Sequence, residues 1–326
     1  MNTKPTLLFA VCMTAYAVSG IWGADMVLSE TVSANAALFE QGDYRNGGEF
    51  YLRAGGITAV VAPKLSGRLM GIVPDGETNL LWVHEKPEID LWGWKSYGGD
   101  KTWIGPQDAW NDVIVSESDN WPPPAEFDGN PYEVVRHDSR SVEMLSETVA
   151  KWNLRVRRVV SIETNGTVSV MSRLEKADET APVVAPEGMR FTNWLVTQLP
   201  VAPYVDVLLC GQKRVVNGDG ATNVFQLSYV TDNSVRVQTG EIPKGKTSVK
   251  AFFDADVMVI PVRHGGKLIV RQKPVSEVET TESERGQIYV TGRDSLLPGV
   301  NPYMEIEWSQ SWPDSEQTVT FWYVTR

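Results

Sequence analysis

Short runs of alternating hydrophobic and polar residues fill most of the chain, and this period of two is typical of β-strands. Turn signals such as Asn165-Gly166 separate the runs at intervals of roughly ten residues, the spacing of sandwich or barrel folds. Asn-Gly predicts a type I′ hairpin turn at that point. We expect strands at 49–54, 57–63, 68–73, 79–84, 154–162, 167–174, 189–199, 204–216, 224–230, 233–239, 247–253, 256–263, 267–273, 287–291, 302–309 and 317–324.

Helical periodicity is scarce, and only residues 106–113 are expected to form a turn or two of helix. The polar stretches 177–187 and 277–286 are interpreted as surface loops, although either could be a linker. The pattern therefore predicts an all-β chain with few short helical turns, whose residues 25–326 form a single domain.

The N-terminus has the pattern of a signal peptide, predicted to span residues 1–24. Lys4 precedes an apolar run at 6–18 that is too short to cross a bilayer. Cleavage is expected after Ser19 or after Ala24. We find no later run of 18 apolar residues, so the mature protein is expected to have no membrane span. The predicted location is outside the cytoplasm, periplasmic or secreted.

Composition narrows the classes of partner. The formal net charge is -11, which argues against nucleic acid or an anionic membrane as a partner. Removal of the leader takes Cys12 and leaves Cys210 as a lone thiol in an apolar run, which we interpret as buried and inert. With three histidines and no nucleotide motif, we expect neither a metal nor a cofactor. The oligomeric state is left open.

The segment 92–124 has an unusual composition for a core element. It holds five of the twelve tryptophans, interleaved with a Gly-Gly step and polar residues. Flat aromatic faces beside fixed hydrogen-bonding groups suit a polar ligand with apolar C–H faces, and a sugar is such a ligand. The alternative is that these tryptophans cap the hydrophobic core. The candidate ligand-binding residues in the segment are Trp94, Asp100, Lys101, Trp103, Gln107 and Trp121.

A second motif lies at 303–308. On a strand, Met304, Ile306 and Trp308 would face the core, while Tyr303 and two carboxylates, Glu305 and Glu307, would face the other way. Carboxylates two residues apart on a strand lie roughly 7 Å apart. Each raises the pKa of the other where water is excluded, which suits a general acid or base. The alternative is a solvated outer face. Hydrolysis is discounted, because neighbours on one strand do not flank a glycosidic bond from two sides.

These motifs together resemble a known superfamily. The run 60–83, with Ser66-Gly67-Arg68 and Asn79-Leu80-Leu81-Trp82, resembles the opening hairpins of galactose-mutarotase-like (aldose-1-epimerase-like) proteins. Four further runs resemble a family of exported bacterial proteins in that superfamily. These runs are YGGDKTWIGPQ at 97–107, NWPPP at 120–124, TNWLVTQLP at 192–200 and PYMEIEW at 302–308. The resemblance covers about residues 45–326.

The resemblance implies a galactose-mutarotase-like β-supersandwich of large antiparallel sheets with a carbohydrate site on a concave face. In sugar mutarotases of this superfamily a late-strand glutamate is the base, and Glu305 or Glu307 looks like its counterpart, with Glu305 preferred. The mutarotase histidine that protonates the ring oxygen has no match, because the nearest run by order, 191–194, lacks histidine. This departure puts mutarotase activity in doubt.

Three functions are compared. The first is an exported carbohydrate-binding protein, with or without acid/base chemistry on the sugar; Glu305 would be the base, Glu307 its neighbour and Lys101 the acid. The second is a true aldose epimerase or mutarotase, and an isomerase is favoured over a hydrolase. The third is a non-catalytic structural or interaction module of a polysaccharide-handling system. The substrate-binding candidates are Trp94, Asp100, Trp103, Gln107, Trp121, Arg68, Trp194 and Tyr303.

Overall fold

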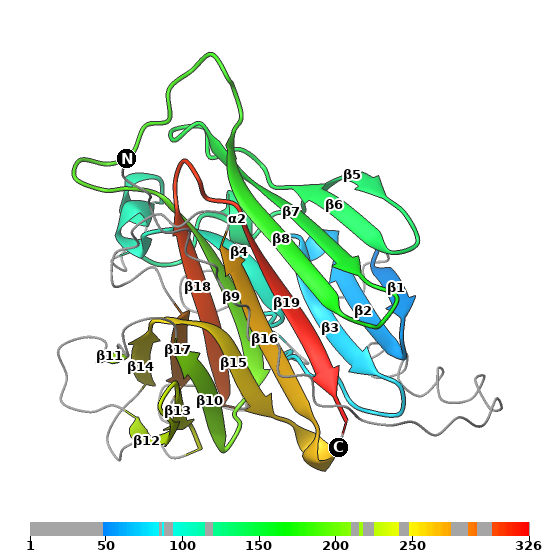
Figure 1. Ribbon diagram of the computed structural model, residues 1–326. Helices are drawn as coiled ribbons and strands as arrows, with labels where there is room; N and C mark the ends of the chain where they lie inside the picture. Colours follow the sequence, from blue (N-terminus) through cyan, green and yellow to red (C-terminus); the bar gives the residue numbers. More distant parts are fainter. Residues whose placement is uncertain are drawn as a thin grey trace, which may run out of the picture.

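The structure is a computed structural model in which residues 48–84, 87, 94–114, 120–209, 215–217, 225–240, 248–274, 286–291 and 302–325 are described. Within these residues the strands form two antiparallel sheets, as expected for an all-β chain (Figure 1). Among the described residues, helix is confined to segments of one or two turns: η1 (Pro63–Leu65), η2 (Gln107–Asp112), α2 (Ala125–Asp128) and η4 (Arg263–Gly265). Among the described helices, none has the length and apolar character needed to span a bilayer.

The first sheet has nine strands. Its order is β1 (Phe50–Ala54), β2 (Ile57–Ala62), β3 (Arg68–Pro74), β4 (Asp100–Gly105), β9 (Thr192–Pro200), β18 (Tyr303–Ser311), β17 (Gly286–Thr291), β14 (Ser248–Phe253) and β11 (Val215–Asn217). The second sheet has ten strands, in the order β12 (Gln226–Thr231), β13 (Ser234–Gln238), β10 (Tyr204–Leu209), β15 (Ala255–Pro261), β16 (Lys267–Pro274), β19 (Gln317–Val324), β8 (Val168–Lys176), β7 (Leu154–Ile162), β6 (Ser141–Leu145) and β5 (Glu133–His137).

The hydrophobic core lies between the two sheets. On β7 the side chains alternate strictly between buried and half-buried, as expected for a strand with one face toward the core. Met304, Ile306 and Trp308 of β18 are fully buried, as their alternation predicts. The indole Nε1 of Trp308 donates to the carbonyl of Ala255 at 3.1 Å, which satisfies the polar end of that ring.

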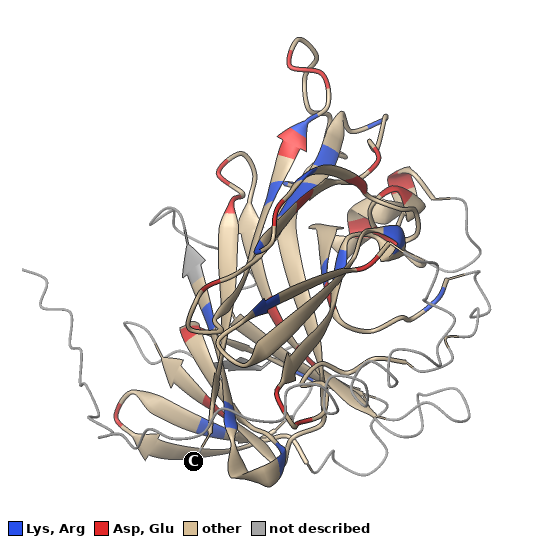
Figure 2. Cartoon of the chain, turned by 90° about the vertical axis from the view of Figure 1, so that its right-hand side faces the viewer, with Lys and Arg blue, Asp and Glu red and all other residues tan. Residues whose placement is uncertain are grey.

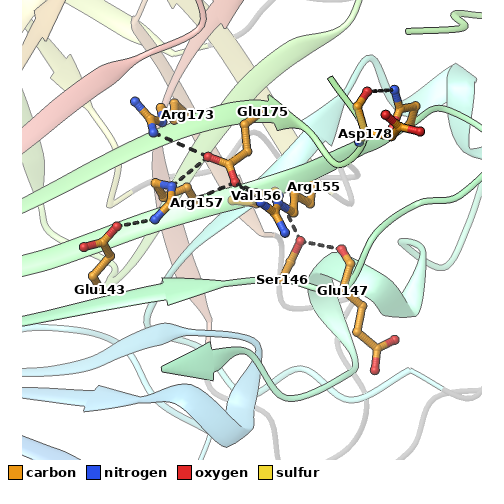
Figure 3. A network of polar contacts seen from close by, with 10 residues as sticks. Glu143, Ser146, Glu147, Arg155, Val156, Arg157, Arg173, Glu175 and Asp178 are labelled. Carbon is orange, nitrogen blue, oxygen red and sulfur yellow. Dashed lines mark hydrogen bonds and ion pairs between the residues drawn. The ribbon is translucent and has the colours of Figure 1, made fainter. Parts of the chain in front are cut away.

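The outer face of the ten-stranded sheet carries charged side chains (Figure 3). Glu175 lies among three arginines and pairs with Arg157 at 2.7 Å and with Arg155 at 2.7 Å, and Arg173 lies 3.4 Å away. In the view of Figure 2 basic and acidic residues are interspersed along the strands. This arrangement leaves the polar positions of β7 and β8 solvated on one side and the apolar positions in the core.

A buried ion pair connects the two sheets. Arg158 of β7 donates to Asp100 of β4 at 2.5 Å, and both side chains are completely buried. Thr197 of β9 donates to the other carboxylate oxygen at 2.7 Å. Thr102 and Ser172 share a hydrogen bond of 3.0 Å beside this pair. Asp100, Thr102 and Ile104 therefore face the ten-stranded sheet, and the alternate residues of β4 face away from it.

Two expectations from the sequence need correction. Residues 79–84 are not a strand but make one isolated bridge, Val83 to Gly98. There the side-chain amide of Asn79 bonds to the backbone of β3. Its Oδ1 accepts from Ile72 N at 3.0 Å, and its Nδ2 donates to Met70 O at 2.9 Å. The turn at 163–167 joins β7 to β8 as predicted but is not type I′, because only Gly166 has positive φ, whereas type I′ needs it at both central residues.

Strands β4, β5 and β6 were not expected from the pattern, because their sequences mix charges with apolar residues. Other expectations fall outside the described residues. They are the signal peptide at 1–24, Trp92, Cys210 and most of the 277–286 loop.

Removal of the buried carboxylate is expected to weaken the fold strongly. Asp100→Ala would leave Arg158 charged, buried and without a carboxylate partner, which costs about 3–5 kcal/mol of the free energy of unfolding. Urea denaturation of the two proteins measures this difference. Asp206→Ala is the control, because the Asp206–Arg236 pair at 2.7 Å is partly solvated and such pairs contribute about 1 kcal/mol or less. Equal losses in the two variants would contradict the role given to Asp100.

Candidate functional site

The register of three neighbouring strands brings distant parts of the sequence onto one sheet face. Trp103 of β4 faces Trp194 of β9, and Lys101 lies in line with Glu307 of β18 across Val196. All of these side chains lie on the outer face of the nine-stranded sheet, which is the face turned away from the ten-stranded sheet. The two informative segments of the sequence are therefore joined through β9.

We call Lys101, Gln198, Lys250, Glu305 and Glu307 the acid–base cluster. Glu305 lies directly across from Gln198 on one side and from Tyr289 on the other, and Tyr289 in turn faces Lys250. Four of the five side chains are at least nine-tenths buried, although they carry charge or amide groups. Buried charges require partners, and the members of this cluster differ in the partners that they have.

The Glu307 side chain is held in position by two donors. Its Oε2 accepts from Lys250 Nζ at 2.8 Å and from the indole Nε1 of Trp194 at 2.7 Å. Lys250 also lies over the Trp194 ring, 5.0 Å from its centroid. Two donors on one oxygen, one of them an ammonium, fix the position of this side chain.

Glu305 has fewer hydrogen-bond partners than Glu307. Its Oε1 accepts one hydrogen bond, from Gln198 Nε2 at 2.8 Å, and among the described residues it makes no ion pair. Burial, together with the negative charge of Glu307, raises the pKa of Glu305 to about 7 against the opposing effects of Lys101, Lys250 and Gln198. Glu305 therefore exchanges a proton near neutral pH.

Lys101 carries the complementary shift. Burial lowers its pKa to about 8, and the carboxylates of Asp128, Glu305 and Glu307 oppose that effect. The ammonium lies 4.1 Å from the Trp103 ring centroid and 5.2 Å from that of Trp94. In the described part of the chain it makes no hydrogen bond or ion pair, so cation–π contacts are its direct support.

The backbone before Lys101 explains how this lysine enters a buried strand. Gly98 and Gly99 both have positive φ, 84° and 77°, which only glycine adopts without strain. A Cβ on Gly98 would lie 2.4 Å from the carbonyl oxygen of Trp82. The Gly-Gly step therefore allows the chain to pass close to its own backbone at Trp82.

Arg68 supports the edge of the cluster. It is buried, pairs with Asp128 and donates to the Gly98 carbonyl at 3.0 Å. Trp94 donates to the other oxygen of Asp128 at 3.0 Å. Arg68 therefore fixes the Gly-Gly step and Asp128, whose charge acts on Lys101.

The four described tryptophans of the 92–124 segment form one aromatic group with Trp194. Trp103 makes edge contacts with Trp194 at 5.0 Å and with Trp121 at 6.3 Å, and Trp121 packs on Trp94 at 4.9 Å. Trp103 is only 5 % exposed and Trp110 is completely buried, so both belong to the packing. Trp94, Trp121 and Trp194 are half-buried and retain accessible surface.

Two predicted ligand-binding residues lie away from the cluster. Asp100 faces the ten-stranded sheet and is closed by Arg158, because neighbouring residues on a strand point to opposite faces. The Gln107 amide donates to the backbone and side-chain oxygens of Asn120, at 3.1 and 3.2 Å, and holds η2. Neither contact involves a member of the acid–base cluster.

Tyr303 lies beside Glu305 on the same strand face. Its ring packs on Trp82 with centroids 4.5 Å apart. Burial, aided by the charge of Glu305, raises the pKa of the Tyr303 hydroxyl well above its usual value. Tyr303 therefore remains a neutral phenol next to the carboxylate.

Sequence reasoning missed Gln198, Lys250 and Asp128. Gln198 lies in the run 192–200, in which only Trp194 was a candidate. Lys250 occupies an ordinary alternating position in β14. Their importance depends on strand order and register, for which the sequence carries no local signal. Among the described residues no hydrogen bond or ion pair joins a histidine to Glu305 or Glu307, and no group of three or more metal-ligating residues is found.

Comparison with solved structures identifies the fold. A putative aldose 1-epimerase from Escherichia coli K12 matches with a TM-score of 0.52 and 12% identity, over 85% of this chain and 98% of that chain. This chain has the galactose mutarotase-like fold. A galactose mutarotase-like protein from Clostridium acetobutylicum matches with a TM-score of 0.48 and 11% identity, over 85% and 95% of the two chains. The 4-alpha-glucanotransferase from Thermococcus litoralis matches with a TM-score of 0.45 and 10% identity, over 86% of this chain and 38% of that one.

No protein-family model and no curated protein sequence matches the chain. The fold and the sheet order thus confirm the predicted supersandwich of large antiparallel sheets, while the roles of the individual residues stay predictions.

The two shifted groups predict how stability depends on pH. Folded Glu305 holds its proton above the usual value of 4.5, so its contribution to stability is lost as pH rises from about 4.5 to about 7. Folded Lys101 releases its proton early, so its unfavourable contribution is relieved as pH rises from about 8 to 10.5. Chemical denaturation at a series of pH values measures both effects.

We compare the free energy of unfolding of Glu305→Gln with that of wild type. Between pH 4.5 and pH 8 this difference is expected to shift by roughly 3 kcal/mol in favour of the variant, since one pKa unit corresponds to about 1.4 kcal/mol. Glu143→Gln is the control, because Glu143 lies half-buried on the outer face of the ten-stranded sheet and pairs with Arg157. Parallel pH profiles for wild type and Glu305→Gln would show that Glu305 has an ordinary pKa.

Proposed function

We propose that this protein is an exported carbohydrate-binding protein that acts on a sugar by acid/base chemistry at the acid–base cluster. One observation carries the proposal. Glu305 and Lys101 share one buried sheet face, and their pKa values of about 7 and about 8 are each shifted toward neutral. Groups shifted in this way are concentrated at functional sites, because general acids and bases work best near the operating pH.

The surroundings support a sugar as the ligand. Half-buried Trp94, Trp121 and Trp194 provide aromatic faces for the C–H surfaces of a pyranose. Glu305, Glu307 and Gln198 provide acceptors for hydroxyl groups. The fold itself does not decide function, so the proposal depends on this combination of groups.

The reaction that fits these groups is interconversion of anomers. Glu305, ionised, would accept the proton of the anomeric hydroxyl, while protonated Lys101 would donate a proton to the ring oxygen. The bond between C1 and the ring oxygen then breaks, C1 becomes a carbonyl, and rotation followed by the reverse steps gives the other anomer. The total number of protons on the two side chains is unchanged.

Glu307 has a supporting part in this reaction. Lys250 and Trp194 both donate to its Oε2, so this oxygen is already occupied by donors of the protein. Its charge instead raises the pKa of Glu305 and opposes the fall in the pKa of Lys101. This division of roles favours Glu305 over Glu307 as the base.

The proposed chemistry predicts a narrow pH profile. The active form needs ionised Glu305 and protonated Lys101, so the rate of anomer interconversion should rise through a pKa of about 7 and fall through one of about 8. Polarimetry or NMR of freshly dissolved aldoses measures the rate above the buffer background. Glu305→Gln is expected to lower the rate by at least 10²-fold, the usual contribution of a general base.

Glu143→Gln is the matched control and should leave the rate unchanged, since Glu143 lies on the other sheet. Titration of intrinsic tryptophan fluorescence with the same sugars tests binding separately from catalysis. Binding without rate enhancement would favour the non-catalytic module. Absence of both, across neutral and acidic sugars, would overturn the proposal.

A further inference from the structure

Three buried polar atoms on the outer face of the nine-stranded sheet have no hydrogen-bond partner among the described residues. They are Trp103 Nε1, Gln198 Oε1 and Glu307 Oε1. The residues that carry them are 5 %, 1 % and 1 % exposed. Buried polar groups in native proteins are nearly always hydrogen-bonded, so each exception needs a physical explanation.

The chain's own contacts force two of these atoms to be free. Where Glu305 is ionised, as the proposed base must be, its carboxylate only accepts, so Gln198 turns its NH2 group toward Glu305 and its own Oε1 points elsewhere. Lys250 and Trp194 both donate to Oε2 of Glu307 and leave Oε1 without a donor. The protein holds two oriented acceptors and supplies neither with a donor.

The two acceptors are close neighbours. Glu305 is directly across from Gln198, and Glu307 follows Glu305 by two residues, so Gln198 and Glu307 are diagonal neighbours on antiparallel strands. Diagonal pairs have Cβ atoms roughly 7 Å apart, within reach of each other for side chains of this length. A ligand that binds such a diagonal pair must present two hydrogen-bond donors close together, as two hydroxyl groups on adjacent carbons do.

The third atom narrows the chemistry of the ligand. Trp103 Nε1 is a donor, and it belongs to the ring whose face supports Lys101 at 4.1 Å. A ligand that satisfies all three atoms must both donate and accept hydrogen bonds. Hydroxyl groups do both, whereas a carboxylate only accepts and an ammonium only donates.

We infer that Gln198 and Glu307 are specificity-determining acceptors for two adjacent, unsubstituted hydroxyl groups of the ligand, while Trp103 Nε1 donates to an oxygen of the same molecule. The inference rests on the proposed function, because it takes the ligand to be a sugar at the acid–base cluster. It adds that the ligand carries a free vicinal diol and that sugars lacking either hydroxyl are rejected.

The wild-type protein provides the first test. D-Glucose and D-galactose, each with its 2-, 3-, 4- and 6-deoxy analogues, are titrated against tryptophan fluorescence and by calorimetry. Loss of one hydroxyl leaves a buried acceptor unpaired, so we expect about a 10- to 100-fold rise in Kd at two adjacent positions and smaller changes elsewhere. Ordered water bound to these three atoms would not give the analogues different affinities.

Variants assign the positions. Gln198→Met removes the acceptor with similar volume and should abolish discrimination at one of the two positions, and Glu307→Gln should abolish it at the other. Gln310→Met is the matched control. Gln310 is also buried on β18 and also has an unpartnered side-chain atom, Nε2, but it lies on the face toward the ten-stranded sheet. It should leave both discriminations intact.

The outcomes separate the two ideas. If no sugar binds, the proposed function fails. If the parent sugars bind and every deoxy analogue binds equally well, the proposed function stands and this inference is overturned. Discrimination at two positions that survives both Gln198→Met and Glu307→Gln would likewise overturn it. The deoxy series needs only wild-type protein, so the inference is testable even if a variant does not fold.

Discussion

The central strands of the nine-stranded sheet are buried on both faces, and the rest of the structure depends on how they accommodate charge there. All six residues of β4 are buried, and so are eight of the nine in β18. A strand in that position normally carries continuous apolar sequence. Here the two strands carry Asp100, Lys101, Glu305 and Glu307, and each buried charge must find a partner or be neutralised by a change of protonation.

The two faces of β4 solve this problem in opposite ways. Toward the ten-stranded sheet, Asp100 has an arginine at 2.5 Å and a threonine at 2.7 Å, so the charge is fully compensated. On the outer face, Lys101 has aromatic rings and three carboxylates that act at longer range. The closed pair fixes the position of the strand, and the open arrangement leaves proton affinities near neutral. A structural face and a reactive face are thus built from adjacent residues.

How much of this follows from the sequence depends on the range of the interaction. Period-two alternation predicts that Glu305 and Glu307 share a face, and β18 confirms it. The same rule separates Asp100 from Lys101, but no strand was predicted at 100–105, so the rule was not applied there. The contacts of Gln198, Lys250 and Arg158 depend on which strands are neighbours and in what register, and these follow from the packing of the whole sheet rather than from any local run.

Under the proposed function a lysine acts as the acid, and this role makes sense only in a dry environment. A solvated lysine has a pKa near 10.4 and releases its proton too reluctantly to act as an acid at neutral pH. Burial against Trp103 and Trp94 brings the pKa of Lys101 to about 8, and the same burial raises that of Glu305 to about 7. One physical cause, exclusion of water from this face, therefore prepares both the acid and the base. Under the proposed function the tryptophans serve two purposes, because they present surface to a sugar and also keep dry the lysine that would act on it.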